Sequence, residues 1–175
     1  MSNQPFVTDI KALRERARRH IEQAYQADRD TVIKICNEAL ATEIICVLRY
    51  KRRYLMAEGI NADSVAAEFA QHAAEEQGHA DRIAQRIVQL GGEPNLSPEG
   101  LSGRSHPEYV EADTLLDMIK EDLIAERVAI DSYKEMIQYL GDKDPTTRRM
   151  FEEILAMEEE HADDSVSLLG GMPKR

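Results

Sequence analysis

The sequence predicts an all-α protein built as a four-helix bundle, and two observations support this. The chain has 175 residues, of which 42% are hydrophobic and 31% charged, with no Trp, a composition that favours long helices over sheets. Breaks rich in Gly and Pro, at residues 91–107 and 141–145 and more weakly at 59–61, separate four long segments. The length suits one domain. We expect the bundle over residues 30–175, preceded by an N-terminal extension over residues 1–29.

Capping residues and turn signals set the expected ends of the four helices. An acidic residue precedes two of them, and an Asp-Pro pair opens the last, where Asp caps the helix and Pro takes its first position. The four helices are expected at residues 31–58 behind Asp30, at residues 64–90, at residues 114–140 behind Asp113, and from Asp144-Pro145 onward.

Residues 91–112 form the longest expected connection. More than 20 residues without regular structure are unusual inside a compact domain. One family of four-helix bundles nevertheless needs a long crossover that runs the length of the bundle between the second and third helices. We therefore assign this segment to such a crossover.

An extra amphipathic helix is expected before the bundle, over residues 8–25. Apolar residues recur there at helical spacing, and basic residues lie between them. Such a basic cluster can contact DNA phosphates, but basic surface helices are common, so DNA binding is the less favoured interpretation. The apolar residues are Ile10, Leu13, Ala17, Ile21 and Ala24, and the basic ones are Lys11, Arg14, Arg16, Arg18 and Arg19.

Charge and cysteine content restrict the class of protein. The formal net charge of -11 disfavours nonspecific nucleic-acid binding by the whole surface and attracts small cations, although it is also ordinary for an acidic protein. With no signal-peptide pattern and no apolar run of about 18 residues, we expect a cytoplasmic protein without membrane contact. Cys36 and Cys46 lie roughly 15 Å apart on one helix, so we expect two buried thiols rather than a disulfide.

Two Glu-x-x-His units carry the chemical signal. They are Glu76-Gln-Gly-His79 in the second helix and Glu158-Glu-Glu-His161 in the fourth. Residues three apart on a helix face the same way, so each unit can hold one metal ion while its carboxylate bridges to a second. One unit alone would be weak evidence in a Glu-rich chain, but these two occupy corresponding places in two helical hairpins.

Each unit also has an upstream Glu at a matched distance. Glu43 precedes Glu76 by 33 residues, and Glu126 precedes Glu158 by 32. The helix lengths on both sides of each turn return the two carboxylates to a similar height. All six side chains can therefore meet in the middle of the bundle.

Four buried carboxylates would be prohibitively costly without cations, because like charges at close range raise one another's pKa. Two divalent ions would neutralise that charge. Oxygen-rich ligands with some imidazole suit iron or manganese, whereas structural zinc prefers Cys and His. We expect two iron ions per subunit, with manganese or zinc as the alternatives.

Tyr50 and Tyr133 extend the match, because each lies seven residues after the lone Glu of its helix. Each hydroxyl could donate to a ligating carboxylate in the other half of the bundle. Two core aromatic residues at heptad spacing explain the pattern equally well.

Several acidic residues and histidines near the motifs are not expected to bind the metal. Glu68 and His72 have no matching unit on the fourth helix, so we interpret them as surface residues. His20 and His106 lie outside the bundle without identifiable partners. Three glutamates next to the predicted ligands should face other sides of their helices, where they line an iron path or are simply solvated. They are Glu75, Glu159 and Glu160.

This pattern, over about residues 30–169, resembles the bacterioferritin branch of the ferritin-like superfamily, and the stretch Glu75-Glu-Gln-Gly-His-Ala-Asp81 is especially similar. The resemblance implies a ferroxidase that oxidises Fe(II) with O2 or H2O2 and stores the ferric product inside a protein shell. It also implies the ligand roles. Glu76 and Glu158 would bridge two irons, Glu43 and His79 would complete one coordination sphere, and Glu126 and His161 the other.

Two departures from bacterioferritins change what the resemblance implies. Gln77 stands where they place the haem-binding methionine, so haem is not expected. Only 14 residues follow His161, too few for the fifth helix of a 24-subunit shell, so the chain looks more like Dps-like mini-ferritins with a bacterioferritin-type site. A homo-oligomeric dodecamer is therefore expected over a 24-mer. The alternatives are Dps-like protection of DNA from oxidative damage and a partner-dependent di-iron peroxidase of rubrerythrin type.

Overall fold

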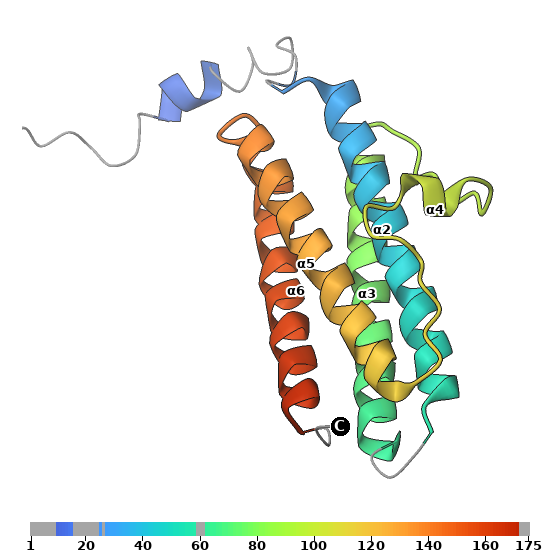
Figure 1. Ribbon diagram of the computed structural model, residues 1–175. Coiled ribbons are helices and arrows are strands. Elements are labelled where there is room, and N and C mark those ends of the chain that lie inside the picture. Colours follow the sequence, from blue (N-terminus) through green and yellow to red (C-terminus); the bar gives the residue numbers. More distant parts are fainter. Residues whose placement is uncertain (1–9, 16–24, 26, 59–61, 172–175) are drawn as a thin grey trace, which may run out of the picture.

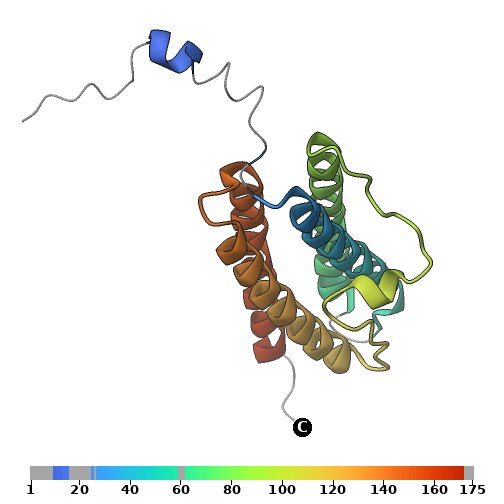
Figure 2. The same ribbon diagram turned by 90° about the horizontal axis from the view of Figure 1, so that it is seen from above.

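Four long helices form the body of the protein, which the computed structural model describes over residues 10–15, 25, 27–58 and 62–171. They run side by side as a bundle (Figures 1 and 2), and the described residues contain no strand. The all-α four-helix bundle predicted from the sequence is confirmed. The helices are α2 (Arg29–Met56), α3 (Ala62–Gln89), α5 (Leu115–Leu140) and α6 (Pro145–Gly171).

The expected N-terminal helix is described only in part. Residues 10–15 are helical, but residues 8, 9 and 16–24 of the expected helix lie outside the described residues. His20 and three of the five basic residues, Arg16, Arg18 and Arg19, fall in that part. Among the described residues, no helix is long and apolar enough to cross a bilayer.

Two of the expected helix caps are wrong by one or two residues. The N-cap position of helix α2 is Asp28, not Asp30, and Asp30 lies in the first turn, where its negative charge is favourable near the helix N-terminus. Helix α5 is capped by Thr114, not Asp113, because the Thr114 hydroxyl accepts a hydrogen bond from the Asp117 amide at 3.2 Å.

The cap of α6 is confirmed. Pro145 is the first helical residue, and the Asp144 carboxylate accepts a hydrogen bond from the Thr147 amide at 3.0 Å. This is the geometry of an N-cap followed by proline.

The helices pair as two hairpins, α2 with α3 and α5 with α6, and two apolar clusters fill the space between them. One cluster contains Ile83 and Leu140, and the other contains Phe69 and Ile119. Along α3 the residues of one cluster end at Ala73 and those of the other begin at Ala80. The interval between them holds Glu76 and His79, so the apolar clusters enclose a polar middle layer. Cys36 and Cys46 are buried free thiols, as predicted.

The long crossover between α3 and α5 is confirmed. It contains the short helix α4 (Leu101–Arg104) and runs along α2 to reach the far end of the bundle (Figure 1). At its start, Gly91 has a φ of 80°, and the Gly92 amide donates to the Ile87 carbonyl at 2.9 Å. A left-handed glycine in this place ends a helix by pairing its last carbonyls.

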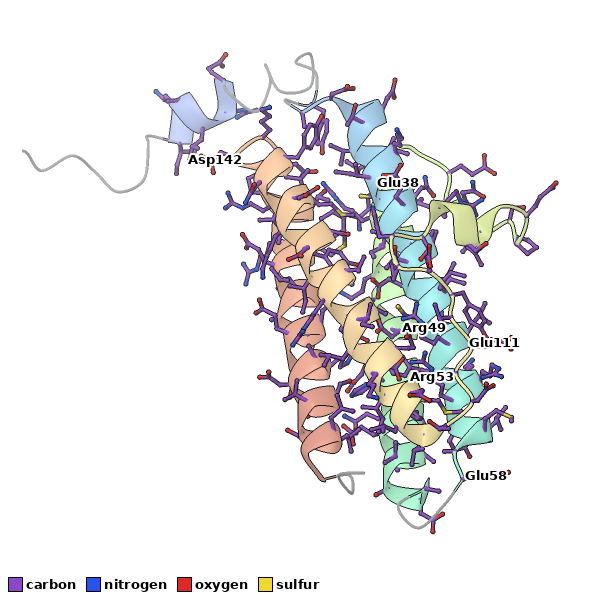
Figure 3. The ribbon with its side chains drawn as sticks, viewed as in Figure 1. Glu38, Arg49, Arg53, Glu58, Glu111 and Asp142 are labelled. Carbon is purple, nitrogen blue, oxygen red and sulfur yellow. The ribbon has the colours of Figure 1, made fainter. Side chains whose placement is uncertain are left out.

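Two buried arginines of α2 hold the crossover (Figure 3). Arg49 donates to the carbonyl of Glu108 at 2.9 Å, and Arg53 donates to that of Val110 at 3.3 Å. Arg53 also forms a buried ion pair with Asp122 of α5, so one side chain joins both hairpins and the crossover.

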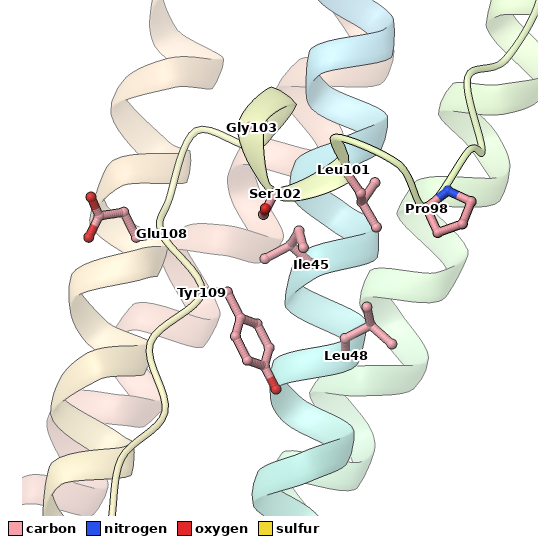
Figure 4. A pocket seen from close by; sticks show the side chains of 8 residues that line it. All are labelled: Ile45, Leu48, Pro98, Leu101, Ser102, Gly103, Glu108 and Tyr109. Carbon is pink, nitrogen blue, oxygen red and sulfur yellow. The ribbon is translucent and has the colours of Figure 1, made fainter.

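The crossover leaves a hollow of about 830 Å³ against α2 (Figure 4). Ile45 and Leu48 of α2 face Leu101 and Tyr109 of the crossover there. No predicted metal ligand lines this hollow, so it lies apart from the polar middle layer.

Asp122→Asn should destabilise the metal-free protein by about 3–5 kcal/mol, because it leaves the Arg53 charge buried without its partner. Unfolding in urea measures this change. The control is Glu111→Gln, which removes the exposed partner of Arg52 and should cost no more than about 1 kcal/mol. Equal effects of the two substitutions would contradict the assignment.

Candidate metal centre

The polar middle layer contains all six residues predicted as metal ligands. Each long helix contributes at its mid-length, so the side chains converge on the bundle axis, and none is more than 5% exposed. They are Glu43 on α2, Glu76 and His79 on α3, Glu126 on α5, and Glu158 and His161 on α6.

One group of possible ligands surrounds His79. Its Nδ1 atom lies 3.1 Å from Glu43 Oε2, 3.3 Å from Glu76 Oε2 and 3.2 Å from Glu158 Oε1. A single ring N–H cannot donate to three carboxylates at once. The group therefore has more acceptors than donors.

A second group contains Glu76, Glu126, Glu158 and His161, whose ligand atoms lie within 4.8 Å of one another. The first group meets the same criterion. Glu76 and Glu158 belong to both groups, whereas each of the other four residues belongs to one of the two. This is the arrangement that two neighbouring metal ions with two bridging carboxylates require.

The donor atoms fit a cation. Five buried atoms of the second group have no hydrogen-bond partner: Glu76 Oε1, Glu126 Oε2, both Glu158 oxygens and His161 Nδ1. Buried polar atoms without partners are costly, and metal coordination removes that cost. Carboxylate oxygens with some imidazole nitrogen are the donors that iron and manganese prefer.

Protons compensate part of the charge when no metal is bound. Burial and the neighbouring Glu43 charge raise the pKa of Glu76 well above its usual value, and burial and Glu76 do the same to the pKa of Glu158. Burial alone would lower the pKa of His79, but the neighbouring Glu158 and Glu43 carboxylates favour the protonated ring and raise this pKa to about 10. Burial opposes ionisation of Glu43, yet hydrogen bonds from His79 and Glu76 hold its pKa below the usual value.

The two tyrosines contact the group across the hairpins. The Tyr50 hydroxyl of α2 donates to Glu126 of α5, and the Tyr133 hydroxyl of α5 donates to Glu43 of α2. Both tyrosines are buried, and burial next to these carboxylates raises the pKa of each phenol. Each therefore keeps its proton and orients a carboxylate that belongs to the other half.

Glu75, expected to line an iron path or to be solvated, is paired with a predicted ligand. Its carboxylate lies 2.9 Å from His161 Nε2, while His161 Nδ1 faces Glu76 Oε1 at 3.5 Å. A carboxylate on one ring nitrogen keeps the proton there and leaves the other nitrogen free for a metal. The position of Glu75 next to a predicted ligand was a signal in the sequence. Its contact with His161, however, depends on how α3 is rotated relative to α6, which the sequence pattern of α3 does not determine.

Two expectations for the histidines are wrong, whereas the exposure of Glu159 and Glu160 agrees with the solvated alternative. His72 was expected at the surface and is 2% exposed. Its ring stacks on His161 with centroids 4.0 Å apart, and its partner on α6 is Asp164, one helical turn after His161 and thus on the same face. His106, expected to have no partner, lies 3.0 Å from the Thr42 hydroxyl. Glu159 and Glu160 are exposed.

Cys46 lies on the same face of α2 as Glu43, and is 1% exposed. Burial, together with the Glu76 charge, raises the pKa of its thiol well above the usual value. The side chain of Arg49 contacts its sulfur at 3.9 Å. Cys46 is thus a neutral thiol beside the group.

Comparison with known proteins identifies the family of this chain. The family model of the ferritin-like domain matches residues 33–174. A bacterioferritin from Brucella melitensis is 32% identical over 135 residues, which cover 75% of this chain and 78% of that protein.

Two solved structures have the same fold. The bacterioferritin-related protein of Bacteroides fragilis, described as a dodecameric thioferritin, superposes with a TM-score of 0.79 at 33% identity, covering 83% of this chain and 88% of that one. The bacterioferritin of Desulfovibrio desulfuricans, described with a diiron site, has a TM-score of 0.73 at 25% identity over 85% and 84% of the two chains. The chain therefore belongs to the ferritin-like family.

Proposed function

We propose that this protein is a ferroxidase that stores or detoxifies iron by oxidising Fe(II) at a site of two metal ions inside each subunit. The observation that carries the proposal is the sharing of Glu76 and Glu158 between two groups of ligands. A structural ion would need only one group. Two adjacent groups joined by two carboxylates suit a reaction in which two Fe(II) ions are oxidised together.

The role of each ligand follows from its position. Glu43 and His79 would complete the coordination of one iron, and Glu126 and His161 that of the other. Tyr133 and Tyr50 would hold the two non-bridging carboxylates, and Glu75 would fix the ring of His161. Iron supplies the electrons, and the side chains fix its geometry and exclude water.

The overall reaction balances with either oxidant. Two Fe(II) ions give two electrons to O2, which takes up two protons and leaves as H2O2, or to H2O2, which takes up two protons and leaves as two waters. These two protons come from solvent, because Glu76, Glu158 and His79 give up their own protons when iron binds. The relatives named bacterioferritin support this activity.

We also propose that the subunits form a closed shell of twelve. The related Bacteroides fragilis protein is described as dodecameric. In this chain, apolar side chains at the end of α2 are exposed, among them Tyr54 and Leu55. They border a hollow of about 530 Å³ that continues onto Ala70 and Ala74 of α3. Exposed apolar surface of this kind is typical of a contact between subunits.

Glu158→Gln should slow Fe(II) oxidation, because the amide keeps the shape of the bridging carboxylate but not its charge. We expect the initial rate of Fe(II) oxidation to fall at least 10-fold, since loss of even a ligand's hydrogen-bond partner costs about 10- to 100-fold. Absorbance after mixing anaerobic protein and two Fe(II) per subunit with air measures the rate. The control is Glu160→Gln on the exposed face of α6, and a wild-type rate no faster than buffer would refute the proposal.

Metal binding should release protons and strengthen as pH rises. The pKa values of Glu76 and Glu158 are raised well above the usual value and that of His79 is raised to about 10, so metal binding must displace protons from these groups. Each proton released raises the apparent affinity about tenfold per pH unit. Calorimetric titration with Co(II) in two buffers of different ionisation enthalpy counts these protons, and an affinity independent of pH between 6 and 8 would contradict the assignment.

The mass in solution tests the assembly. Twelve copies of the 19.8 kDa chain give about 240 kDa, which light scattering after gel filtration distinguishes from 24 copies or a dimer. Changing Leu55 to Glu should split the shell, because it places a charge in the apolar contact. A dimer in the unmodified protein would overturn the proposed shell.

A further inference from the structure

A second cluster of possible metal ligands lies between α3 and α6, next to the buried group but distinct from it. Glu68 and His72 come from the first half of α3, and Asp164 comes from the last part of α6, at the same end of the bundle (Figure 1). His72 Nε2 lies 3.4 Å from Glu68 Oε1 and 3.5 Å from Asp164 Oδ2. One donor atom from each residue fits within 4.8 Å.

His72 supplies a buried polar group without a hydrogen-bond partner. The side chain is 2% exposed, and neither ring nitrogen makes a hydrogen bond. The ring is held between Tyr50, which it meets edge-on at 5.1 Å, and His161, on which it stacks at 4.0 Å. It therefore presents Nε2 to the two carboxylates in a fixed orientation.

The carboxylates of this cluster are open to solvent. The Glu68 side chain is 31% exposed and that of Asp164 is 41% exposed. A hydrated cation can reach both oxygens from outside and then meet the buried nitrogen. Two carboxylates and one imidazole form a donor set for Fe(II), Mn(II), Co(II) or Zn(II).

This cluster connects to the buried group through shared residues. His72 belongs to it and also to a group with Glu75 and His161, and His161 in turn belongs to the group with Glu76, Glu126 and Glu158. Possible ligands thus continue without a gap from half-exposed carboxylates to fully buried ones. A chain of donors of this kind allows an ion to move inward while it exchanges one ligand at a time.

We propose that Glu68, His72 and Asp164 form a third divalent-cation site, the outer site, which collects Fe(II) and passes it inward. Binding at the outer site stands by itself, whereas delivery rests on the proposed ferroxidase function. The competing explanation is an ion pair in which a protonated His72 serves the two carboxylates and no metal binds.

Anaerobic titration with Co(II) separates these explanations by stoichiometry. We expect three Co(II) per subunit in the unmodified protein and two in Asp164→Asn or Glu68→Gln, with the affinity of the lost ion reduced at least 10-fold. The matched control is Asp163→Asn, because Asp163 is the exposed neighbour of Asp164 and lies about 100° away around α6, and it should keep three. Anomalous diffraction from Co(II)-soaked crystals should place the third ion beside His72 Nε2.

Other outcomes distinguish the two proposals. Two ions in both the unmodified protein and Asp164→Asn, with none beside His72, would overturn the outer site and leave the ferroxidase proposal intact. One ion that is lost only in Asp164→Asn and Glu68→Gln would support the outer site and overturn the buried pair of metals.

Delivery has its own readout. In Asp164→Asn the oxidation rate at limiting Fe(II) should fall several-fold and recover at saturating Fe(II), because the buried ligands are unchanged. An unchanged rate at limiting Fe(II), in a variant that has lost the third ion, would overturn the delivery role while leaving the outer site as a binding site.

Discussion

The architecture depends on placing four carboxyl groups in the interior of one small bundle. Ionised together without cations they would repel one another strongly, since few water molecules remain to screen them. The molecule reduces this cost in two ways. Raised pKa values favour the protonated forms of Glu76 and Glu158, and His79, with a pKa of about 10, carries a positive charge among the oxygens. Divalent ions complete the neutralisation, so the metal-free interior is arranged for a charge that only cations supply.

The surrounding helices give this layer its rigidity. Apolar clusters on both sides exclude water, while Arg53 and Asp122 fasten the hairpins together near one end. The crossover is bound to α2 through the carbonyls of Glu108 and Val110. Each ligand therefore projects from the middle of a long helix whose neighbours are fixed above and below it, which suits a site that must keep its geometry while ions arrive and leave.

Much of the metal centre was predictable, because the helical repeat relates the spacing of residues in the sequence to the side of the helix that they face. The Glu-x-x-His units and the two nearly equal intervals of 33 and 32 residues place six side chains at one height without any knowledge of packing. The errors have a common physical cause. His72 and Glu75 are buried or paired because of what α6 presents to them, and His106 meets Thr42 because of the path of the crossover. Such contacts depend on the relative rotation of helices, which the spacing within a single helix does not determine.

The six ligands and the two tyrosines of the buried layer form two equivalent sets, one from each hairpin. The first helix of each hairpin carries a Glu and, two turns later, a Tyr that reaches across to the other hairpin, and the second helix carries the Glu-x-x-His unit. Two identical copies of a single hairpin, related by a twofold axis through the bundle, would already contain all six ligands and both tyrosines. In a single chain, by contrast, the two halves can differ. His72 is such a difference, because α3 carries it and α6 has no histidine at the equivalent position.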